Sequence, residues 1–432
     1  MLDANHLTEN LEDYRAALAR RGATGLDLEG VAERNTRRKL LQKEYDDLVH
    51  EQRELGPQIA KKKKAGEDAA ELMARSTAIK EQIKEAERGL KEAEEDVRQA
   101  VLVLPNVPHA DALEGGEDDG VIRDVWGQPK EFPFKAKDHV ALCDATGLVE
   151  LGERATRLAG SSFVVYMGQG ARLARALINF FLDLHTTEHG YTEVAPPLLV
   201  NQTTMTGTGQ LPKFREELYH VGSDDLFLIP TAEVPVTNLH QDEILEGERL
   251  PFGYCAYTPC FRREAGASGK LTRGLKRLHQ FDKVELVRFC RPEESDAQHQ
   301  LLLGHAQEPL RRLGLHYRVK ELAAGDMGPA AARCYDLEAH SPATGEWLEV
   351  SSCSVFTDYQ ARRAGIRFKD RKAADGKKPK AQLVHTLNAS GLALPRVIIA
   401  ILETYQQEDG TIRVPNALAP YMGGLEVLGA PR

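Results

Sequence analysis

The chain reads YTPCFRREAG over residues 257–266 and TRGLKRLHQFDKVE over residues 272–285. Apolar and polar residues alternate on both sides of a basic middle part, which is typical of two strands joined by a loop. The first strand leads into Arg262, and Lys276 precedes the second. Arginines at the end of a hairpin can hold a polyphosphate, because guanidinium groups match phosphate oxygens in geometry and charge. By itself this pattern is slightly more typical of a surface hairpin than of a nucleotide site.

The first hundred residues have the periodicity of helices rather than strands. Residues 4–22 predict a short amphipathic helix, and Asp27 is a candidate N-cap for the next one. Apolar residues then recur every three, four or seven positions in two runs, over residues 41–59 and 72–104. The two runs predict an antiparallel helical hairpin, a coiled coil over about residues 27–104. Each helix would extend roughly 50 Å at 1.5 Å per residue.

Two details of this expected arm carry further predictions. Pro57 predicts a kink near Gly56, since a proline inside a helix removes a backbone donor. Residues 61–64 are four lysines at the expected tip. An isolated run of charge is more often a solvated surface than a binding site, so the tip alone does not indicate RNA.

The composition changes at about residue 106, where a Pro- and Gly-containing acidic stretch begins. We predict an N-terminal domain over residues 1–105, a linker over 106–120 and a second domain over 121–432. In the second domain residues 171–189 predict a helix, and several strand-like segments cover 191–290. Strands and helices alternate without a regular βαβ repeat, which favours an α+β domain on a mostly antiparallel sheet.

Composition and missing motifs exclude several classes of function. The chain has 432 residues, 42% of them apolar, and a net charge of −9, which is unusual for a protein covered by nucleic acid. It has no G-x-x-x-x-G-K-[ST] loop, no H-E-x-x-H and no C-x-x-C spacing among its six cysteines. No apolar stretch is long enough to span a membrane, and the N-terminus has no leader pattern. We therefore expect a cytoplasmic protein with no membrane partner and reduced thiols.

The hairpin segment resembles motif 2 of class II aminoacyl-tRNA synthetases, in the form found in seryl-tRNA synthetases. Residues 190–197 (GYTEVAPP) resemble motif 1, a proline-bearing strand, and residues 385–396 (HTLNASGLALPR) resemble motif 3, which leads into a helix over 397–405. Residues 231–233 (TAE), residues 349–352 (EVSS) and the arm extend the match over essentially the whole chain. Departures from the family pattern occur at Arg263, residues 269–271, Ala389 and Pro395.

The resemblance implies a class II catalytic domain, an antiparallel sheet flanked by helices, that forms a homodimer through motif 1. It implies that the enzyme activates L-serine with ATP to seryl-adenylate and transfers it to the 3′ end of tRNA(Ser), and of tRNA(Sec) as well. The attacking group is the serine carboxylate, which is ionised at pH 7, so this step needs no general base. Catalysis then depends on positioning and on neutralising phosphate charge.

The resemblance also implies roles for individual residues. The catalytic residues are Arg262, Arg396 and Glu349. Mg²⁺, the expected cofactor with ATP, takes Glu349 and Ser352, oxygen ligands that suit this ion. ATP contacts a set drawn from the motif 2 hairpin, residues 349–352 and motif 3, namely Arg262, Arg263, Glu264, Leu278, Phe281, Glu349, Val350, Ser351, Ser352 and Arg396. L-serine contacts a second set, namely Thr231, Ala232, Glu233, Arg262, Glu285, Asn388 and Ser390.

Glu285 is notable without any resemblance, because it lies between Val284 and Leu286 on an apolar strand. A carboxylate is costly there unless something pairs with it, and the ligand is one such partner. A pocket of this kind rejects alanine by leaving polar groups unpaired, and threonine by size. In the family the helical arm grips the long variable arm of the tRNA held by the other subunit.

Two alternatives stay open at this point. A ligase of the same fold that loads a carrier protein would lack the arm over residues 27–104. A catalytically inactive, dimeric RNA-binding or regulatory protein is expected to have lost Arg262, Glu285, Glu349 or Arg396, and all four are present.

Overall fold

The computed structural model describes residues 1–265, 274–371 and 379–429. The family departure at residues 269–271 lies outside these ranges. The chain forms two compact units, of which the first comprises Met1–Ala19 and Ala23–Val107. The second comprises Arg20–Gly22 and Pro108–Arg432.

The first unit is built from four helices: α1 (Ala4–Glu9), α2 (Leu11–Ala19), α3 (Leu28–Ala65) and α4 (Ala70–Leu102). The prediction of one helix over residues 4–22 is wrong, because Asn10 leaves the helical conformation at φ −131° and ends α1. Asp27 caps α3 as predicted, since its carboxylate accepts the Gly30 amide at 2.9 Å. Gly66 ends α3 with a left-handed φ of 74°, which glycine adopts without steric cost.

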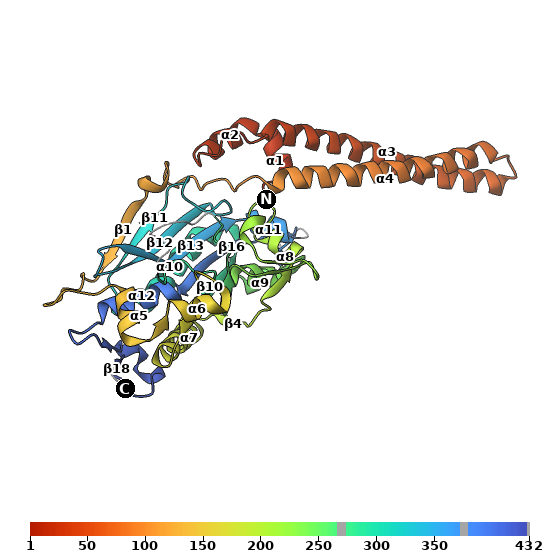
Figure 1. Ribbon diagram of the computed structural model, residues 1–432. Helices are drawn as coiled ribbons and strands as arrows, with labels where there is room; N and C mark the ends of the chain where they lie inside the picture. The colour runs from red at the N-terminus through yellow and green to blue at the C-terminus, as the bar shows by residue number, and fades with distance from the viewer. Residues whose placement is uncertain (266–273, 372–378, 430–432) are drawn as a thin grey trace. The chain divides into compact units, whose positions relative to one another are not determined.

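Helices α3 and α4 lie side by side as an antiparallel hairpin, which confirms the predicted coiled-coil arm (Figure 1). Leu55 on α3 and Ile79 and Leu90 on α4 are buried. Arg75 donates to both carboxylate oxygens of Glu51 across the pair, at 2.8 and 2.9 Å. The helix assignment of α3 is continuous through Pro57, and a bend there stays a prediction.

The second unit is organised by an eight-stranded sheet with the order β1-β11-β12-β13-β16-β10-β9-β4. Neighbouring strands are antiparallel except β4, which pairs in parallel with β9, so the predicted α+β fold on a mostly antiparallel sheet is confirmed. The strands are β1 (Val121–Trp126), β4 (Thr192–Glu193), β9 (Phe252–Phe261), β10 (Gln280–Cys290), β11 (Tyr317–Glu321), β12 (Arg333–His340), β13 (Trp347–Thr357) and β16 (His385–Ala393).

Three long helices pack with this sheet: α7 (Gln169–Thr187), α10 (Ser295–Arg312) and α12 (Leu394–Thr404). Helix α7 buries one apolar stripe that includes Leu177 and Phe181, in the same core cluster as Ile399 of α12 and Leu286 of β10. The helices predicted over 171–189 and 397–405 are therefore present, with their first residues two to three positions earlier than expected. The resemblance to motif 1 implies a strand within residues 190–197, and the structure has a short one: Thr192–Glu193 pair with β9 as β4, and Val194 N donates to Cys255 O at 2.9 Å.

Shorter elements complete the second unit. The short helices are α5 (His139–Thr146), α6 (Glu153–Ala159), α8 (Gln202–Gly207), α9 (Glu233–Thr237) and α11 (Tyr359–Ala364). The small sheets pair β2 (Val149–Glu150) with β3 (Val165–Tyr166), β5 (Leu199–Asn201) and β6 (His220–Val221) with β7 (Leu226–Leu228), β8 (Ile244–Glu246) and β15 (Gln382–Leu383) with β14 (Arg367–Lys369), and β17 (Ile412–Arg413) with β18 (Val427–Leu428). Within the described ranges, no helix has the length and apolar character needed to cross a membrane.

Candidate active site

A cavity of about 640 Å³ in the second unit collects most of the residues singled out from the sequence. Its walls come from β10, β12, β13 and β16, from the first turns of α9 and α12, and from loops that include Arg262, the residue after β9. The predicted residues that line it are Thr231, Glu233, Arg262, Glu264, Leu278, Phe281, Glu349, Val350, Ser351, Ser352, Asn388, Ser390 and Arg396.

Three predicted residues do not line the cavity. Ala232 is fully buried behind it, and so is Glu285, which reaches the cavity through Asn388. Arg263 is exposed and donates to the carbonyl oxygen of Glu216 at 3.2 Å. The predicted contact of Arg263 with ATP would therefore require a different position of its side chain.

Arg262 occupies the end of the motif 2 hairpin because β9 and β10 pair up to Phe261 and Gln280. Its amide donates to His279 O at 2.9 Å, and its Nε donates to Pro230 O at 3.4 Å. The guanidinium carbon lies 5.1 Å from the ring centroid of Phe281, which allows a cation–π contact. These contacts fix the arginine head at the cavity wall.

Arg396 lies in the first turn of α12 and faces Glu349 of β13. Its Nη1 is 3.2 Å from Glu349 Oε2 and donates to Glu349 O at 2.7 Å, while Nε donates to Lys276 O at 3.2 Å. Arg396 therefore connects three parts of one side of the cavity. These are the start of α12, strand β13 through Glu349, and the motif 2 hairpin through Lys276. Lys276, which also lines the cavity, was not among the predicted site residues.

A polar pocket occupies another side of the cavity. Asn388 Nδ2 donates to Glu233 Oε2 at 3.0 Å and to Glu285 Oε1 at 2.7 Å, so one amide joins two carboxylates. Gln360 Nε2 donates to Glu233 Oε1 at 2.6 Å. Burial, and then the nearby Glu285 carboxylate, raise the pKa of Glu233 to about 7.

Glu285 has a partner that the sequence interpretation missed. Lys283 forms an ion pair with Glu285 and donates to Thr231 Oγ1 at 2.8 Å, and only 5% of its surface is exposed. The expectation that Glu285 needs a partner is confirmed, but the protein itself supplies one before any ligand binds. The signal was present in the sequence, since residues two apart on a strand point to the same face.

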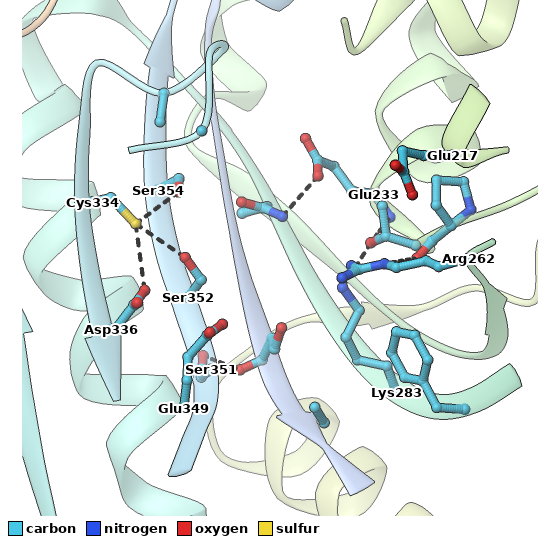
Figure 2. A pocket seen from close by; sticks show the side chains of 18 of the residues that line it. Glu217, Glu233, Arg262, Lys283, Cys334, Asp336, Glu349, Ser351, Ser352 and Ser354 are labelled. Carbon is cyan, nitrogen blue, oxygen red and sulfur yellow. Dashed lines mark hydrogen bonds between the residues drawn. The ribbon is translucent and has the colours of Figure 1, made fainter. Parts of the chain in front are cut away.

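Asp336 of β12 is a second cavity residue that the sequence interpretation missed. It pairs in register with Ser352 of β13, and both line the cavity with Glu349. Figure 2 shows these three side chains together on the side opposite Arg262 and Lys283. Burial, and then the Glu349 carboxylate, raise the pKa of Asp336 well above its ordinary value. No motif contains Asp336, and only the β12–β13 register places it here.

The hydroxyl groups of Ser351 and Ser352 have different hydrogen-bond partners. Ser352 Oγ lies 3.0 Å from Cys334 Sγ, beside the two carboxylates, whereas Ser351 Oγ donates to Ser390 O on β16 at 2.6 Å. Within the described residues no group of three or more His, Cys, Asp or Glu side chains has the arrangement of a metal site. A Mg²⁺ ion that takes few protein ligands and relies on phosphate oxygens is compatible with this donor set.

A mostly antiparallel sheet with an arginine directly after β9, a second arginine in the first turn of the helix that follows β16, and a carboxylate on β13 facing that second arginine defines a class II aminoacyl-tRNA synthetase domain. Residues 215–405 match the model of the class II tRNA synthetase core domain (G, H, P, S and T). Residues 1–108 match the seryl-tRNA synthetase N-terminal domain. The chain belongs to the seryl-tRNA synthetase family, and its function is that of a serine–tRNA ligase.

Similar proteins support this assignment over the full length. The serine–tRNA ligase of Syntrophotalea carbinolica is 50% identical over 431 residues and covers 100% of both chains. That of Nitratidesulfovibrio vulgaris is 48% identical over 429 residues and covers 99% of both chains. The crystal structure of seryl-tRNA synthetase from Pyrococcus horikoshii complexed with ATP superposes with a TM-score of 0.89 at 36% identity, covering 99% of both chains.

Proposed function

We propose that the cavity activates L-serine with ATP and then transfers the seryl group to the 3′ end of tRNA(Ser), with tRNA(Sec) as a second acceptor. The observation that carries this proposal is that Arg262, Arg396 and Glu349 line the same cavity as the Glu233–Asn388 pocket. Cations that suit a triphosphate and acceptors that suit a small amino acid are thus within reach of one another.

In this proposal the chain positions charges and does not transfer a proton during activation. The serine carboxylate is already the nucleophile at pH 7, and it attacks the α-phosphorus while pyrophosphate leaves. Arg262 binds the α-phosphate, and Arg396 binds the far end of the triphosphate. Phe281, Leu278 and Glu264 contact the adenine, with Val350 and Ser351 beside the nucleotide. Arg263 becomes a nucleotide ligand only if its side chain leaves Glu216.

Serine is held by the polar pocket. Glu233 accepts from its ammonium, while Glu285, Asn388, Ser390 and Thr231 surround the hydroxyl, with the buried Ala232 closing the pocket behind them. An amino acid that lacks the hydroxyl, such as alanine, leaves buried polar groups unpaired, so the enzyme can discriminate against it 10⁴-fold or more. Threonine is excluded by the size of the pocket.

Mg²⁺ is part of the proposal, with Glu349 and Ser352 as its ligands. When bound with ATP it neutralises phosphate charge as a Lewis acid. The support from the structure is the chemistry of the donors, since a carboxylate and a hydroxyl lie in the same cavity as the two phosphate-binding arginines.

The proposal assigns residues 1–105 to tRNA binding, 106–120 to a linker and 121–432 to catalysis. The arm α3–α4 carries exposed lysines 61–64 at the C-terminal end of α3, which suits contacts with phosphates. The proposal also includes a homodimer through residues 190–197, which contain the edge strand β4, and a cytoplasmic location. A solved complex of A. aeolicus tRNA(Sec) with the M. kandleri enzyme, 19% identical and with a TM-score of 0.57, shares the fold.

The test is the exchange of labelled pyrophosphate into ATP, run with each of the twenty amino acids and no tRNA. Serine alone should support exchange, and Arg262→Ala should reduce it at least about 10²-fold, as loss of a transition-state contact does. Exchange that is equally fast with alanine or threonine would contradict the serine pocket.

A second test separates the two halves of the proposal. Replacing residues 30–100 by a short loop should leave exchange unchanged and abolish charging of tRNA(Ser). Equal loss of both activities would contradict the proposed division. Dimerisation is tested separately by sedimentation, where a monomer with full charging activity would remove the dimer from the proposal.

A further inference from the structure

Lys283 is a cation in a place where lysine is rarely found. It lies on β10 between Asp282 and Val284, lines the cavity, and has 5% of its surface exposed. Lysine is almost never shielded from water to this degree unless it is paired. Its two partners, Glu285 and Thr231, both belong to the proposed serine pocket. The lysine is therefore built into the pocket and is not a surface charge.

The groups around Lys283 come from five elements or loops. Glu285 lies on the same strand, Thr231 comes from the loop before α9, and Glu233 from α9 itself. Cys260 lies near the end of β9, and Arg262 is the first residue after that strand. Asn388 of β16 holds the two carboxylates together, with its Nδ2 at 3.0 Å from Glu233 and 2.7 Å from Glu285. Figure 2 shows Lys283 and Arg262 near Glu233, on the same side of the cavity.

Two carboxylates joined by one amide repel each other and favour taking up a proton. One buried cation beside them offsets that tendency, and Lys283 is the cation in contact with Glu285. Serine adds one ammonium and one carboxylate. With Lys283 charged, two carboxylates face two ammonium groups, while Arg262 lies at the serine carboxylate and at the α-phosphate that this carboxylate attacks. Without Lys283 the same pocket has one negative charge in excess.

We propose that Lys283 is a positioning residue for the amino acid: its ammonium offsets the negative charge of the Glu285–Glu233 pair, so that the pair can accept from the serine ammonium, and it holds Thr231 at the pocket wall. This inference rests on the proposed serine pocket. It adds one requirement to the proposed pocket: serine recognition depends on a cation that does not touch the phosphates of ATP.

The charge of the pocket should depend on pH. Burial and Glu285 already raise the pKa of Glu233 to about 7, while Lys283 and Arg262 lower it. Removing the lysine charge moves the pKa of Glu233 further up, so Glu233 keeps its proton at pH values at which it is ionised in the wild type. A protonated carboxyl donates a hydrogen bond and no longer attracts the serine ammonium. Serine binding should then be weak at pH 7 and improve as the pH rises.

The test compares Lys283→Met, Lys283→Gln and Lys283→Arg with Lys369→Met, a matched loss of an exposed lysine on β14. Serine-dependent pyrophosphate exchange is measured from pH 6 to pH 9, with KM determined separately for serine and for ATP. We expect Lys283→Met and Lys283→Gln to raise the serine KM about tenfold or more at pH 7, with the ATP KM changed less than about twofold. The defect should shrink toward pH 9, Lys283→Arg should restore part of the affinity, and Lys369→Met should match the wild type.

Two outcomes would overturn the inference. The first is a serine KM in Lys283→Gln that equals the wild-type value at every pH, because glutamine keeps a donor to Thr231 but has no charge. The second is a defect that is independent of pH and equal for serine and ATP, which is the signature of a structural role. If Lys283→Met fails to fold, the glutamine and arginine variants decide. Failure of the wild type itself to use serine would instead contradict the proposed function.

Discussion

Arg396 Nη1 lies 3.2 Å from Glu349 Oε2, and the same nitrogen donates to the backbone oxygen of Glu349 at 2.7 Å. Both residues line the cavity, one at the start of α12 and one on β13. In the proposed function this pair supplies a cation for the triphosphate and a carboxylate for Mg²⁺, and the two groups are already aligned with each other. Both side chains are partly exposed, so their ion pair is weak, and breaking it to bind ligands costs little free energy.

Glu349→Gln should therefore impair the use of Mg²⁺ and ATP and leave serine binding intact. We expect pyrophosphate exchange to fall about 10²-fold or more, since a charge aimed at the transition state is removed. The Mg²⁺ concentration for half-maximal rate should rise as well, and the serine KM should stay within about twofold of the wild type. Binding of Mn²⁺ with ATP, followed by electron paramagnetic resonance, gives a readout independent of activity. Glu153→Gln, at an exposed site on α6, is the control, and equal effects of the two substitutions would contradict the assignment.

Glu233→Gln should stabilise the second unit at alkaline pH while abolishing serine activation. The folded-state pKa of Glu233 is about 7, above the ordinary 4.5, so the native state binds this proton more tightly than the unfolded chain. The stability linked to Glu233 is thus largest below about pH 4.5 and is lost as the pH rises through 7. The difference is about 3 kcal/mol at most.

The measurement is urea unfolding of wild type and Glu233→Gln at pH 5 and pH 8. Both tryptophans, Trp126 and Trp347, lie in the second unit, so their fluorescence follows this unit alone. The variant should gain about 3 kcal/mol of stability over the wild type at pH 8 and only about 1 kcal/mol at pH 5. A gain that is the same at both pH values would contradict the raised pKa.

His185 should make the second unit sensitive to acid. Its ring is fully buried on α7, with Nδ1 2.9 Å from His189 Nδ1, and His189 stacks on His305 at 4.1 Å. Burial, and then the neighbouring histidines, lower the pKa of His185 to about 3. Because the unfolded chain takes up the proton near pH 6.5, this contribution to stability is complete above that pH and is lost as the pH falls.

His185→Gln should remove that part of the acid sensitivity. Between pH 7 and pH 5 the wild type should lose about 2 kcal/mol through this one ring, and the variant should lose correspondingly less. The exposed His220, replaced by glutamine, serves as the control. The same dependence on pH in the wild type and in His185→Gln would show that the ring is not the cause.

The lysines at residues 61–64 should contribute to tRNA binding and to nothing in the catalytic unit. Replacing all four by glutamine should weaken tRNA(Ser) binding and flatten its dependence on salt, by roughly 0.7 to 0.9 in the logarithmic slope for each phosphate that is no longer bound. Serine-dependent pyrophosphate exchange should be unchanged. A variant with Lys130, Lys135, Lys137 and Lys369 replaced by glutamine removes the same charge from exposed sites elsewhere. Equal salt slopes in the two variants would refute the assignment of the tip.

The arm and the sheet hairpin could be predicted from the amino-acid sequence, because both depend on short-range periodicity. Apolar residues at helical spacing on either side of Gly66 specify α3 and α4, and alternation around Arg262 specifies β9 and β10. Local capping was predictable at Asp27 for the same reason. Asn10 was missed because a single residue that leaves the helical conformation changes no apolar periodicity.

The surroundings of the reacting groups, in contrast, follow from the folded chain and from no local pattern. Asp336 meets Ser352 and Glu349 through the register of two strands, and Arg396 meets Glu349 because α12 starts beside β13. Lys283 could have been paired with Glu285 from strand alternation, but its bond to Thr231 joins residues 52 positions apart. Periodicity reports which face a residue occupies, whereas the charge balance of a buried pocket depends on distances between strands and loops that are distant in the sequence.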